Sequence, residues 1–468
     1  FSPNEVPDLH DLTGDAFEKR YWQYVKKGQA GKLKLFREVE AKELWKQMLR
    51  MLFETGHPWM TFKDPSNDRY SNKHEGIVHS SNLCTEILLH TKPTTYESNN
   101  YRQIDEYGET AVCNLGSINL KNHLNEDGSV DYDKLKDTIE ASVRMLDNVI
   151  DINFYPTQEG KISNTKHRPV GLGSMGWHDV FFANDIVYDS QEAISLSNKI
   201  YEFISYHAIL ASSKLAKERG TYSTYEGSLW SQDIFPIDTY CGFMNEKRDM
   251  NIFIGAYESL DWKVVREHVK EHGMRNSNVM AIAPNATISR IADCSSCTEP
   301  YFNNIFARSS QDGDFTVVNE WFVKDMKKRE LWNHALINKI KSVDGDVTQL
   351  DLDIGEEDRL YLEAKYKTAF QVDQISLLKA AAARGRWIDQ GMSVNLFNDK
   401  TSLKYLHDLY ISAWKLGLKT TYYLRSKGAS QIEKASVGGI TNPAIGDVEG
   451  LDGIQACSID NPECESCQ

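Results

Sequence analysis

The sequence predicts an α/β fold in which helices dominate. Three observations support this prediction: long segments with helical spacing of apolar residues, short apolar segments between them, and an alternation of the two along the chain. An α/β barrel and a wound sheet both fit the alternation. The 468 residues allow one large domain or about three of average size.

Five segments have the apolar spacing of amphipathic helices. The clearest runs from Asp131 to Asn153, where apolar residues recur at three- and four-residue steps. Segments 194–219 and 260–272 are each followed by a glycine that stops the helix, and 375–389 and 403–416 complete the set. We therefore expect helices over these five ranges.

Short apolar segments at 76–78, 112–115 and 279–284 predict buried strands between the helices. Each strand would deliver a residue to the loop that follows it. No internal repeat with a fixed period and no low-complexity tract accompanies them.

Composition narrows the function classes. With 41% hydrophobic and 11% aromatic residues the chain can build a substantial core. Its 53 basic and 67 acidic residues give a formal charge of −14, which argues against a broad nucleic-acid footprint but leaves a small phosphorylated ligand open. The sequence has no run of eighteen apolar residues, so it predicts no membrane-spanning helix.

The two ends of the sequence carry further expectations. The start, Phe1-Ser2-Pro3, has no initiating Met and no signal-peptide pattern, so we expect the interior of a longer coding sequence. Eight cysteines are too sparse for a disulfide scaffold and predict cytoplasmic thiols.

The C-terminal segment differs in composition from the rest. The last 45 residues contain no aromatic residue, and residues 441–468 carry six acidic and no basic residues. Such a segment buries too little apolar surface to offset the entropy of ordering, so we expect a folded domain over 1–425 and a flexible acidic tail over 426–468. The tail nevertheless ends in a thiol pair, Cys464 and Cys467.

The sharpest motif is Ser81-Asn82-Leu83-Cys84-Thr85-Glu86-Ile87. In an extended segment, Asn82, Cys84 and Glu86 would share one face. A carboxylate beside a thiol raises the thiol pKa, so a thiolate nucleophile is disfavoured. A hydrogen-atom abstractor, by contrast, needs a neutral thiol, a base and an amide to hold hydroxyls. An ordinary buried cysteine on a strand also fits this pattern.

Three other motifs carry candidate chemistry, each with a structural alternative. Cys113 follows a short apolar segment and would otherwise be a small core residue. A second motif follows a predicted strand and consists of Pro284, Asn285, Ala286, Thr287, Ile288 and Ser289. Its hydroxyls and backbone N–H groups could bind a phosphate, but an ordinary loop without a ligand has the same composition. The pair Tyr422-Tyr423 is otherwise core packing.

Two Cys-x-x-Cys pairs, Cys294/Cys297 and Cys464/Cys467, add up to four possible zinc ligands. Their separation of 166 residues along the chain disfavours a shared site, and the terminal pair suits thiol exchange better.

In order along the chain, these motifs resemble the large, catalytic subunit of a class I ribonucleotide reductase. The resemblance runs from Phe1 to Cys467 and covers the C-terminal portion of that subunit. It implies half of a ten-stranded α/β barrel with surrounding helices, and reduction of ribonucleoside diphosphates to 2′-deoxyribonucleoside diphosphates.

The resemblance also implies residue roles. Cys84 would carry a thiyl radical that removes the 3′-hydrogen, Glu86 would take the 3′-hydroxyl proton, and Asn82 would hold a sugar hydroxyl. Leu83 and Thr85 complete the substrate-binding stretch. Cys113 would be one of two reducing thiols. Further roles are a radical relay through Tyr422 and Tyr423, a diphosphate loop over 284–289, and a redox tail pair at Cys464 and Cys467.

The partners implied are the N-terminal half of the subunit, a small subunit holding a metal-radical cofactor, and thioredoxin or glutaredoxin. We expect no cofactor on this chain itself and no turnover by the chain alone. The second reducing thiol and the effector-reading segments of the family are absent from this sequence, and Ile288 replaces a frequent hydroxyl. Cys241, Cys294, Cys297 and Cys457 receive no role. A structural zinc site and an inactive remnant are the competing hypotheses.

Overall fold

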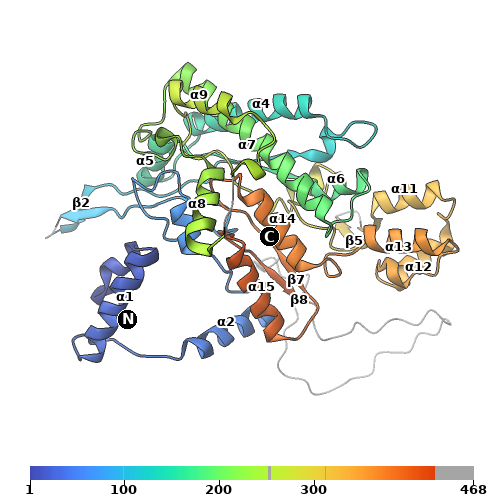
Figure 1. Ribbon diagram of the computed structural model, residues 1–468, viewed down its shortest axis with the longest axis horizontal. Helices are drawn as coiled ribbons and strands as arrows, with labels where there is room; N and C mark the ends of the chain where they lie inside the picture. The colour runs from blue at the N-terminus through green and yellow to red at the C-terminus, as the bar shows by residue number, and fades with distance from the viewer. Residues whose placement is uncertain (98–99, 251–253, 311–312, 427–468) are drawn as a thin grey trace. The chain divides into compact units, whose positions relative to one another are not determined.

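The computed structural model describes residues 1–97, 100–250, 254–310 and 313–426. The predicted tail over 426–468, with Cys457, Cys464 and Cys467, lies outside these residues except for its first position. Helices and short strands mix throughout, which confirms the α/β class (Figure 1).

The α-helices are α1 Gly14–Gln29, α2 Ala41–Thr55, α3 Lys63–Asp68, α4 Tyr132–Ile152, α5 Gln158–His167, α6 Trp177–Ala183, α7 Gln191–Arg219, α8 Pro236–Arg248, α9 Trp262–His272, α10 Ile288–Ile291, α11 Glu320–Lys328, α12 His334–Ser342, α13 Glu356–Lys365, α14 Gln374–Gly385 and α15 Leu403–Lys415. The strands are β1 Thr95–Glu97, β2 Asn100–Glu106, β3 Leu115–Asn119, β4 Gly171–Met175, β5 Ile305–Ser310, β6 Gly313–Val318, β7 Leu396–Asn398 and β8 Leu424–Ser426.

All five predicted helices are present as α4, α7, α9, α14 and α15, and one of them is shorter than predicted. The segment 375–389 was expected to be helical throughout, but α14 ends at Gly385. The reason is tertiary: Asp389 accepts hydrogen bonds from the backbone N–H groups of Val279 and Met280, at 2.7 and 2.9 Å. Asp389 therefore caps a neighbouring extended segment instead of continuing the helix.

Two of the predicted strands also need correction. Residues 76–78 form no strand, because the backbone N–H of Val78 donates to the side chain of Asn67 rather than to a neighbouring strand. The strand expected at 112–115 begins only at Leu115 and continues to Asn119.

One set of extended segments pairs in parallel, in the order in which the segments occur in the sequence, whereas β1–β2 and β5–β6 pair antiparallel. β3 pairs with β4, Leu172 of β4 bridges Met280, and Ile282 bridges Met392. Residues 390–395 lead into β7, which pairs with β8. The predicted strand at 279–284 thus takes its place in this array, although the named strands of the described chain form four separate two-stranded sheets.

Close approach between neighbours in this array depends on glycine. A Cβ on Gly173 of β4 would stand 2.5 Å from the carbonyl oxygen of Ala281, inside van der Waals contact. Any residue other than glycine at position 173 would therefore require the backbone to shift.

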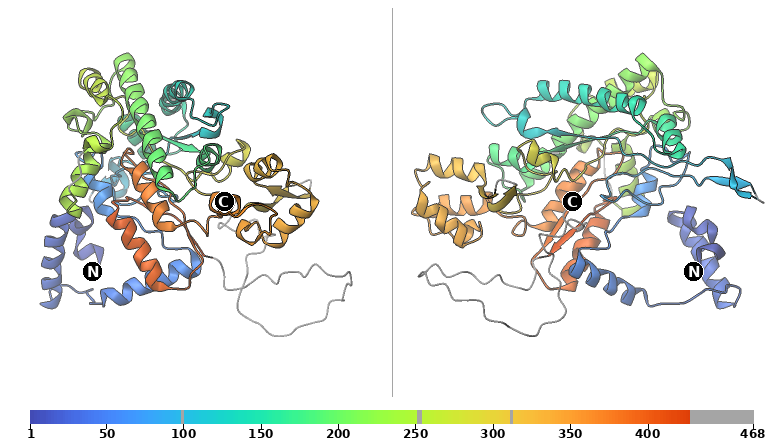
Figure 2. Two further views of the ribbon diagram at one scale, coloured as in Figure 1. Left: turned by 45° about the vertical axis from the view of Figure 1, so that its right-hand side comes forward. Right: turned by 180° about the vertical axis from the view of Figure 1, so that it is seen from behind.

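The helices cover the parallel array and share its core. α4, α9 and α14 all pack against the long helix α7, and Trp177, Trp230 and Trp387 are fully buried in one large apolar cluster. A second cluster lies among α11, α12 and α13, which gather to one side in each view (Figure 2).

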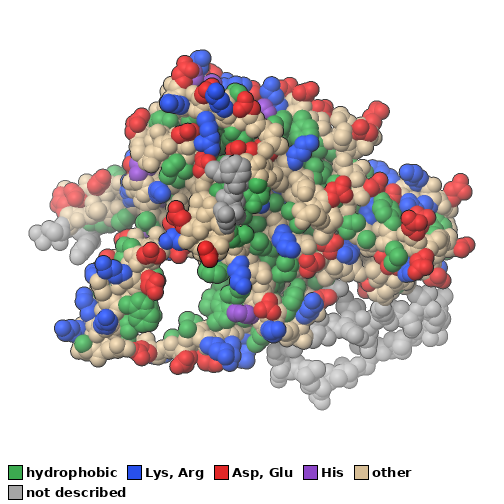
Figure 3. Space-filling view, in the orientation of Figure 1, with side chains coloured by type: hydrophobic (Ala, Val, Ile, Leu, Met, Phe, Trp, Pro, Cys, Tyr) green, Lys and Arg blue, Asp and Glu red, His purple; other side chains and the backbone are tan. Residues whose placement is uncertain are grey.

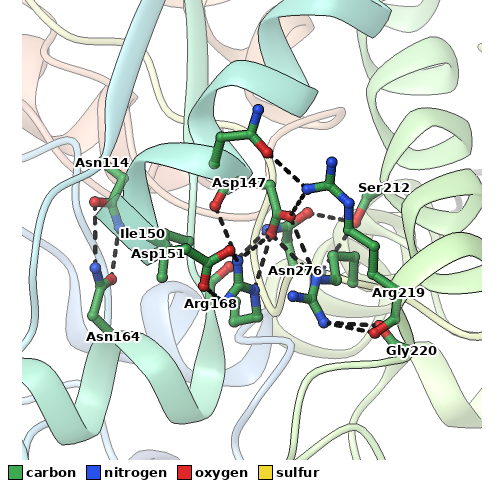
Figure 4. A network of polar contacts seen from close by, with 12 residues as sticks. Asn114, Asp147, Ile150, Asp151, Asn164, Arg168, Ser212, Arg219, Gly220 and Asn276 are labelled. Carbon is green, nitrogen blue, oxygen red and sulfur yellow. Dashed lines mark hydrogen bonds and ion pairs between the residues drawn. The ribbon is translucent and has the colours of Figure 1, made fainter. Parts of the chain in front are cut away.

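A buried ionic network joins α4 to the segments around it (Figure 4). The carboxylate of Asp147 is fully buried and accepts hydrogen bonds from Arg168 at 2.9 Å, Arg219 at 3.0 Å and Asn276 at 3.2 Å. Arg168 also pairs with Asp151. Paired in this way, the buried charges hold α4, α7 and the start of β4 together.

The first two long helices expose many apolar side chains. Phe17, Tyr21 and Trp22 of α1 and Leu44 and Met51 of α2 are exposed, and apolar side chains show at the surface of both helices (Figure 3). No described helix is long and apolar enough to cross a membrane.

Candidate active site

The 82–86 segment is a turn, which corrects the extended conformation expected for it. The backbone N–H of Thr85 donates to the carbonyl of Asn82 at 3.2 Å, and Thr85 has a left-handed φ of 70°. Tertiary contacts hold this unfavourable backbone in place. The Thr85 hydroxyl donates to the carbonyl of Thr421 at 3.1 Å, and the N–H of Gly391 donates to the carbonyl of Glu86 at 2.8 Å.

The turn still brings the three predicted side chains together. The Asn82 carboxamide hydrogen-bonds the Glu86 carboxylate, and the charge of Glu86 acts on the Cys84 thiol. Leu83 points away, with 71% of its surface exposed, while Thr85 is buried. The grouping was predicted correctly, although the backbone that produces it was not.

Glu86 lies in a site poor in positive charge. It is 2% exposed, and Ser393 donates to its Oε2 at 3.2 Å. Burial raises the pKa of Glu86, while the hydrogen bonds from Asn82 and Ser393 partly oppose the shift. A carboxylate in this state takes up a proton more readily than one in water.

The Cys84 thiol contacts a tyrosine hydroxyl. The hydroxyl of Tyr422 donates to Cys84 Sγ at 3.4 Å, although the two residues are 338 positions apart in the sequence. Burial raises the pKa of Cys84, the hydrogen bond from Tyr422 opposes the shift, and the charge of Glu86 adds to it. Burial likewise raises the pKa of Tyr422. Both groups are therefore protonated at neutral pH, as a hydrogen-atom transfer between them requires.

Cys113 belongs to the same electrostatic environment. It lies just before β3, and its side chain reaches the surface. Loss of hydration raises the pKa of Cys113 to about 11, with smaller contributions from the charges of Glu86 and Cys84. The second candidate thiol is thus also neutral.

An aromatic cluster surrounds the tyrosine pair. The rings of Tyr422 and Tyr423 are 4.3 Å apart between centroids, and Trp59 lies 5.0 and 5.2 Å from them. His57 contacts Tyr423 edge-on at 5.5 Å. Sequence reasoning missed Trp59 and His57, because no local spacing relates them to residues more than 360 positions later.

The 284–289 segment turns sharply after the third extended segment of the array. Asn285 has a left-handed φ of 57°, and its side chain accepts a hydrogen bond from Ser117 at 2.8 Å and donates one to the carbonyl of Ala283 at 3.0 Å. Ser289 is buried and hydrogen-bonded to Ser296, whereas Ile288 is 47% exposed. The side chain of Asn285 thus fixes the loop from within, leaving its outer residues at the surface.

One group of side chains in the described residues has the composition of a metal site: Glu75, His90, Glu109 and His167. Lys92 and Lys166 already bridge its two carboxylates, with N–O distances of 2.9 to 3.3 Å. Two ammonium charges balance two carboxylates, so the group is an ionic clamp, and we call it the Glu109 clamp. Neither Cys294 nor Cys297 belongs to a metal-ligand group in the part of the chain described.

Comparison with known proteins decides the family. Residues 1–424 match the family model described as the ribonucleotide reductase barrel domain. The chain belongs to this family. The ribonucleoside-diphosphate reductase subunit alpha of Chlamydia trachomatis is 46% identical over 93% of this chain and 40% of its own length. The large chain of Schizosaccharomyces pombe is 34% identical, and the large subunit of Arabidopsis thaliana 35% identical, over 100% of this chain and 57% of their length.

The predicted resemblance to the ribonucleotide reductase family is therefore confirmed, and the chain spans about half the length of the curated relatives it matches. Within this family member, the structure brings together Asn82, Cys84, Glu86 and Tyr422. The roles given to these residues and to Cys113 stay predictions. The same holds for the tail pair, Cys464 and Cys467, which lies outside the described residues.

Proposed function

We propose that this chain supplies the thiyl-bearing part of a ribonucleoside-diphosphate reductase and reduces ribonucleoside diphosphates to their 2′-deoxy products. The observation that carries the proposal is the contact of the Tyr422 hydroxyl with Cys84 Sγ, beside the buried carboxyl of Glu86, in a chain of this family. It goes further than the family assignment, because it assigns the reacting atoms.

The first half of the reaction activates the sugar. A sulfur radical on Cys84 takes the hydrogen atom from C3′, which restores the S–H bond and leaves a carbon radical at C3′. Glu86 accepts the proton of the 3′-hydroxyl, a role that suits a carboxyl whose pKa burial has raised. Asn82 holds a sugar hydroxyl while its other contact fixes Glu86.

The second half removes the 2′-hydroxyl and closes the cycle. The hydroxyl leaves as water after it takes a proton from Cys113 or from a second thiol in the N-terminal half of the subunit. The two thiols together supply two electrons and two protons and end as a disulfide. Cys84 then returns its hydrogen atom to C3′, which regenerates the sulfur radical, and Glu86 returns its proton to the 3′-oxygen. Neutral thiols serve these steps, and the raised pKa values of Cys84 and Cys113 keep both thiols neutral at pH 7.

Radical transfer uses the tyrosine pair. The Tyr422 oxygen radical takes the hydrogen atom of Cys84 along the existing hydrogen bond. Tyr423, whose ring contacts that of Tyr422 at a tilt of 57°, would relay the oxidising radical to Tyr422 from outside. The stored radical would belong to the metal-radical cofactor of a separate small subunit. No cofactor is assigned to this chain.

The remaining parts of the proposal concern binding and recycling. Backbone N–H groups at the start of α10, in the 284–289 loop, would hold the substrate diphosphate, since the first N–H groups of a helix lack intrahelical partners. The tail pair Cys464/Cys467 would reduce the Cys113 disulfide and be recharged by thioredoxin or glutaredoxin. The parallel array would be half of a ten-stranded barrel, completed by the N-terminal half of the subunit.

The test is reconstitution of the chain with its candidate N-terminal half and small subunit, followed by an assay of diphosphate reduction. Tyr422→Phe keeps the ring and removes the hydroxyl, so we expect a folded variant without turnover. The matched variant Tyr410→Phe removes a buried hydroxyl that has no hydrogen-bond partner among the described residues, and should keep normal turnover. Substantial turnover in Tyr422→Phe would overturn the relay.

The tail assignment has a separate test in the same reconstituted enzyme. Cys464→Ser should allow one round of product formation from prereduced protein and then stop turnover with thioredoxin. Dithiothreitol, which diffuses into the site, should restore the rate. Normal turnover with thioredoxin as the sole reductant would exclude the shuttle.

A further inference from the structure

The carboxyl group of Glu299 is linked to the tyrosine pair through Asn395, and the proposed reaction does not use it. Asn395 lies between it and Tyr423: the backbone N–H of Tyr423 donates to Asn395 Oδ1 at 3.1 Å, and Asn395 Nδ2 donates to Glu299 Oε1. Asn395 is 3% exposed, so solvent does not compete for its two ends. A continuous path therefore runs from Glu299 through one carboxamide to the backbone of Tyr423.

We propose that Glu299 is a positioning residue for Tyr423 and acts by fixing the orientation of the Asn395 carboxamide. An amide group has an acceptor end and a donor end of nearly the same shape, so its partners decide which way it points. An ionised carboxylate only accepts hydrogen bonds, and it therefore draws Nδ2 to itself. The acceptor Oδ1 is then turned towards the Tyr423 N–H.

The protonation state of Glu299 controls this arrangement. A neutral carboxyl has an O–H donor of its own, which favours the flipped amide with Oδ1 towards Glu299. Nδ2 would then face the N–H of Tyr423, donor against donor, and the hydrogen bond that anchors this backbone would be lost. The cost of such an unsatisfied buried group is about 1–3 kcal/mol.

Glu299 titrates in the neutral range. Burial raises the pKa of Glu299 to about 7, while the charge of Arg425 and the hydrogen bond from Asn395 oppose the shift. The Tyr423 anchor is thus formed above about pH 7 and weakened below it.

The other titratable groups that interact with Glu299 do not change charge in this range. Cys297 and Tyr188 both feel the charge of Glu299, and burial raises the pKa of the Cys297 thiol to about 12 and that of Tyr188 above its ordinary value. Both stay neutral near pH 7. Arg425 stays charged, because a guanidinium does not lose its proton in proteins. Glu299 is therefore the group on the Asn395 path to Tyr423 whose state changes. His57, whose ring contacts the Tyr423 ring at 5.5 Å, is a titratable neighbour outside this path, so the loss of titration in the Glu299 and Asn395 variants decides between the two.

The inference can be tested on the chain alone by following the ¹⁵N-tyrosine amide resonances from pH 5.5 to 8.5, with the Tyr423 signal assigned from its loss in Tyr423→Phe. We expect this signal to shift with a midpoint near pH 7 and to lose the titration in Glu299→Gln. Glu258→Gln is the matched control, because burial also raises the pKa of Glu258 but its charged neighbours are Arg266, Asp238 and Glu202. Its Tyr423 signal should titrate as in the native chain.

Asn395→Ala provides a second variant if Glu299→Gln does not fold. It removes the bridge while Glu299 remains, so the titration of the Tyr423 amide should again disappear. A Tyr423 amide that does not titrate near pH 7 in the native chain, or that titrates unchanged in either variant, would overturn the inference.

This inference rests on the proposed function for its importance, and the two fail separately. In the reconstituted enzyme, turnover limited by the Tyr423 anchor should rise about tenfold between pH 6 and pH 8 and be flat over this range in Glu299→Gln, as expected for one group titrating near 7. A native profile that Glu299→Gln leaves unchanged would overturn the positioning role in turnover. If Tyr423→Phe turns over normally while the Tyr423 amide of the native chain titrates as expected, the radical relay is overturned and the positioning of Tyr423 by Glu299 is not.

Discussion

Two buried carboxyl groups of this chain, Glu86 and Glu109, have opposite electrostatics. Glu86 is 2% and Glu109 5% exposed. The neighbours of Glu86 are an amide and a hydroxyl, and burial raises its pKa. Burial acts in the same direction on Glu109, but hydrogen bonds from His167, His90 and Lys166 hold its pKa well below the ordinary value. Similar burial thus produces a carboxyl that favours its neutral form in one place and a permanent anion in the other.

The difference follows from what each carboxyl does in the structure. Glu109 accepts from the Nε2 atoms of His90 and His167 at 3.2 and 2.5 Å, and it lies four residues before Cys113. His90 lies four residues after Glu86. The Glu109 clamp therefore joins the two segments that carry the candidate thiols, while no cationic side chain of the described residues pairs with Glu86.

The largest expected effect comes from removing the proposed proton acceptor, Glu86. Glu86→Gln keeps the size and one acceptor atom of the side chain, so we expect turnover of the reconstituted enzyme to fall by about 10²–10⁴-fold. The free energy of unfolding should change by less than about 1 kcal/mol, because a neutral group replaces one whose ionisation burial disfavours. Urea titration and a turnover assay check both numbers. Retained turnover would remove Glu86 from the chemistry.

Glu109→Gln should show the converse pattern, with stability as its main effect. It leaves two ammonium groups and two imidazoles without their common anion. Breaking a buried ion pair costs about 3–5 kcal/mol, and we expect the low end because Lys92 and Lys166 both reach solvent. Urea unfolding measures this loss. Glu97→Gln, on the exposed strand β1, is the control and should stay within about 0.5 kcal/mol. A Glu109→Gln chain as stable as this control would mean that the clamp does not hold the fold.

The pH dependence of stability separates the two carboxyls by sign. Glu109 and Glu75 have folded-state pKa values below their ordinary values, that of Glu75 about 2, so their stabilisation is present above about pH 4.3 and is lost as the pH falls towards 2. Glu86 has a raised pKa, so its contribution is complete at low pH and is lost as the pH rises through that value.

We therefore expect the native free energy of unfolding to fall between about pH 4.3 and 2, with a smaller fall in Glu109→Gln. Urea unfolding at a series of pH values measures both slopes. Equal slopes for the two proteins would contradict the anionic state of Glu109.

The smallest expected effect concerns the hydrogen bond that restrains Glu86. Ser393 donates to its Oε2 at 3.2 Å and stabilises the ionised form. Ser393→Ala should raise the pKa of Glu86 further and move the acid limb of the turnover profile upwards by less than about one unit. If the acid limb moves to lower pH, or moves upwards by several units as it would after loss of a cation, Ser393 does not act as a weak neutral hydrogen-bond donor to Glu86.

Apolar spacing and helix-ending glycines, which are local signals, predicted several helices correctly. Apolar spacing placed a helix at 131–153, and the structure has α4 over Tyr132–Ile152. Gly220 and Gly273 follow the last residues of α7 and α9, as predicted. The spacing gave no prediction for α1, α2 or α11–α13, and it extended α14 by four residues into a segment whose carboxylate caps another strand.

The sequence by itself determined the family and the chemical identity of the candidate site, because the order of several short motifs is a property of the chain. The tertiary structure decided how these residues work. Thr85 adopts a left-handed backbone, which disfavours a β-branched residue, because Thr421 and Gly391 hold it from positions more than 300 residues away.

The same reason explains the electrostatics. Both Glu86 and Glu109 lie beside a short apolar segment with a cysteine nearby, and nothing in those segments distinguishes a proton acceptor from an anion. His167 and Lys166 reach Glu109 from the end of α5, and Ser393 reaches Glu86 from beyond α14. A pKa is set by groups within a few ångströms in space, and only the folded chain brings those groups together.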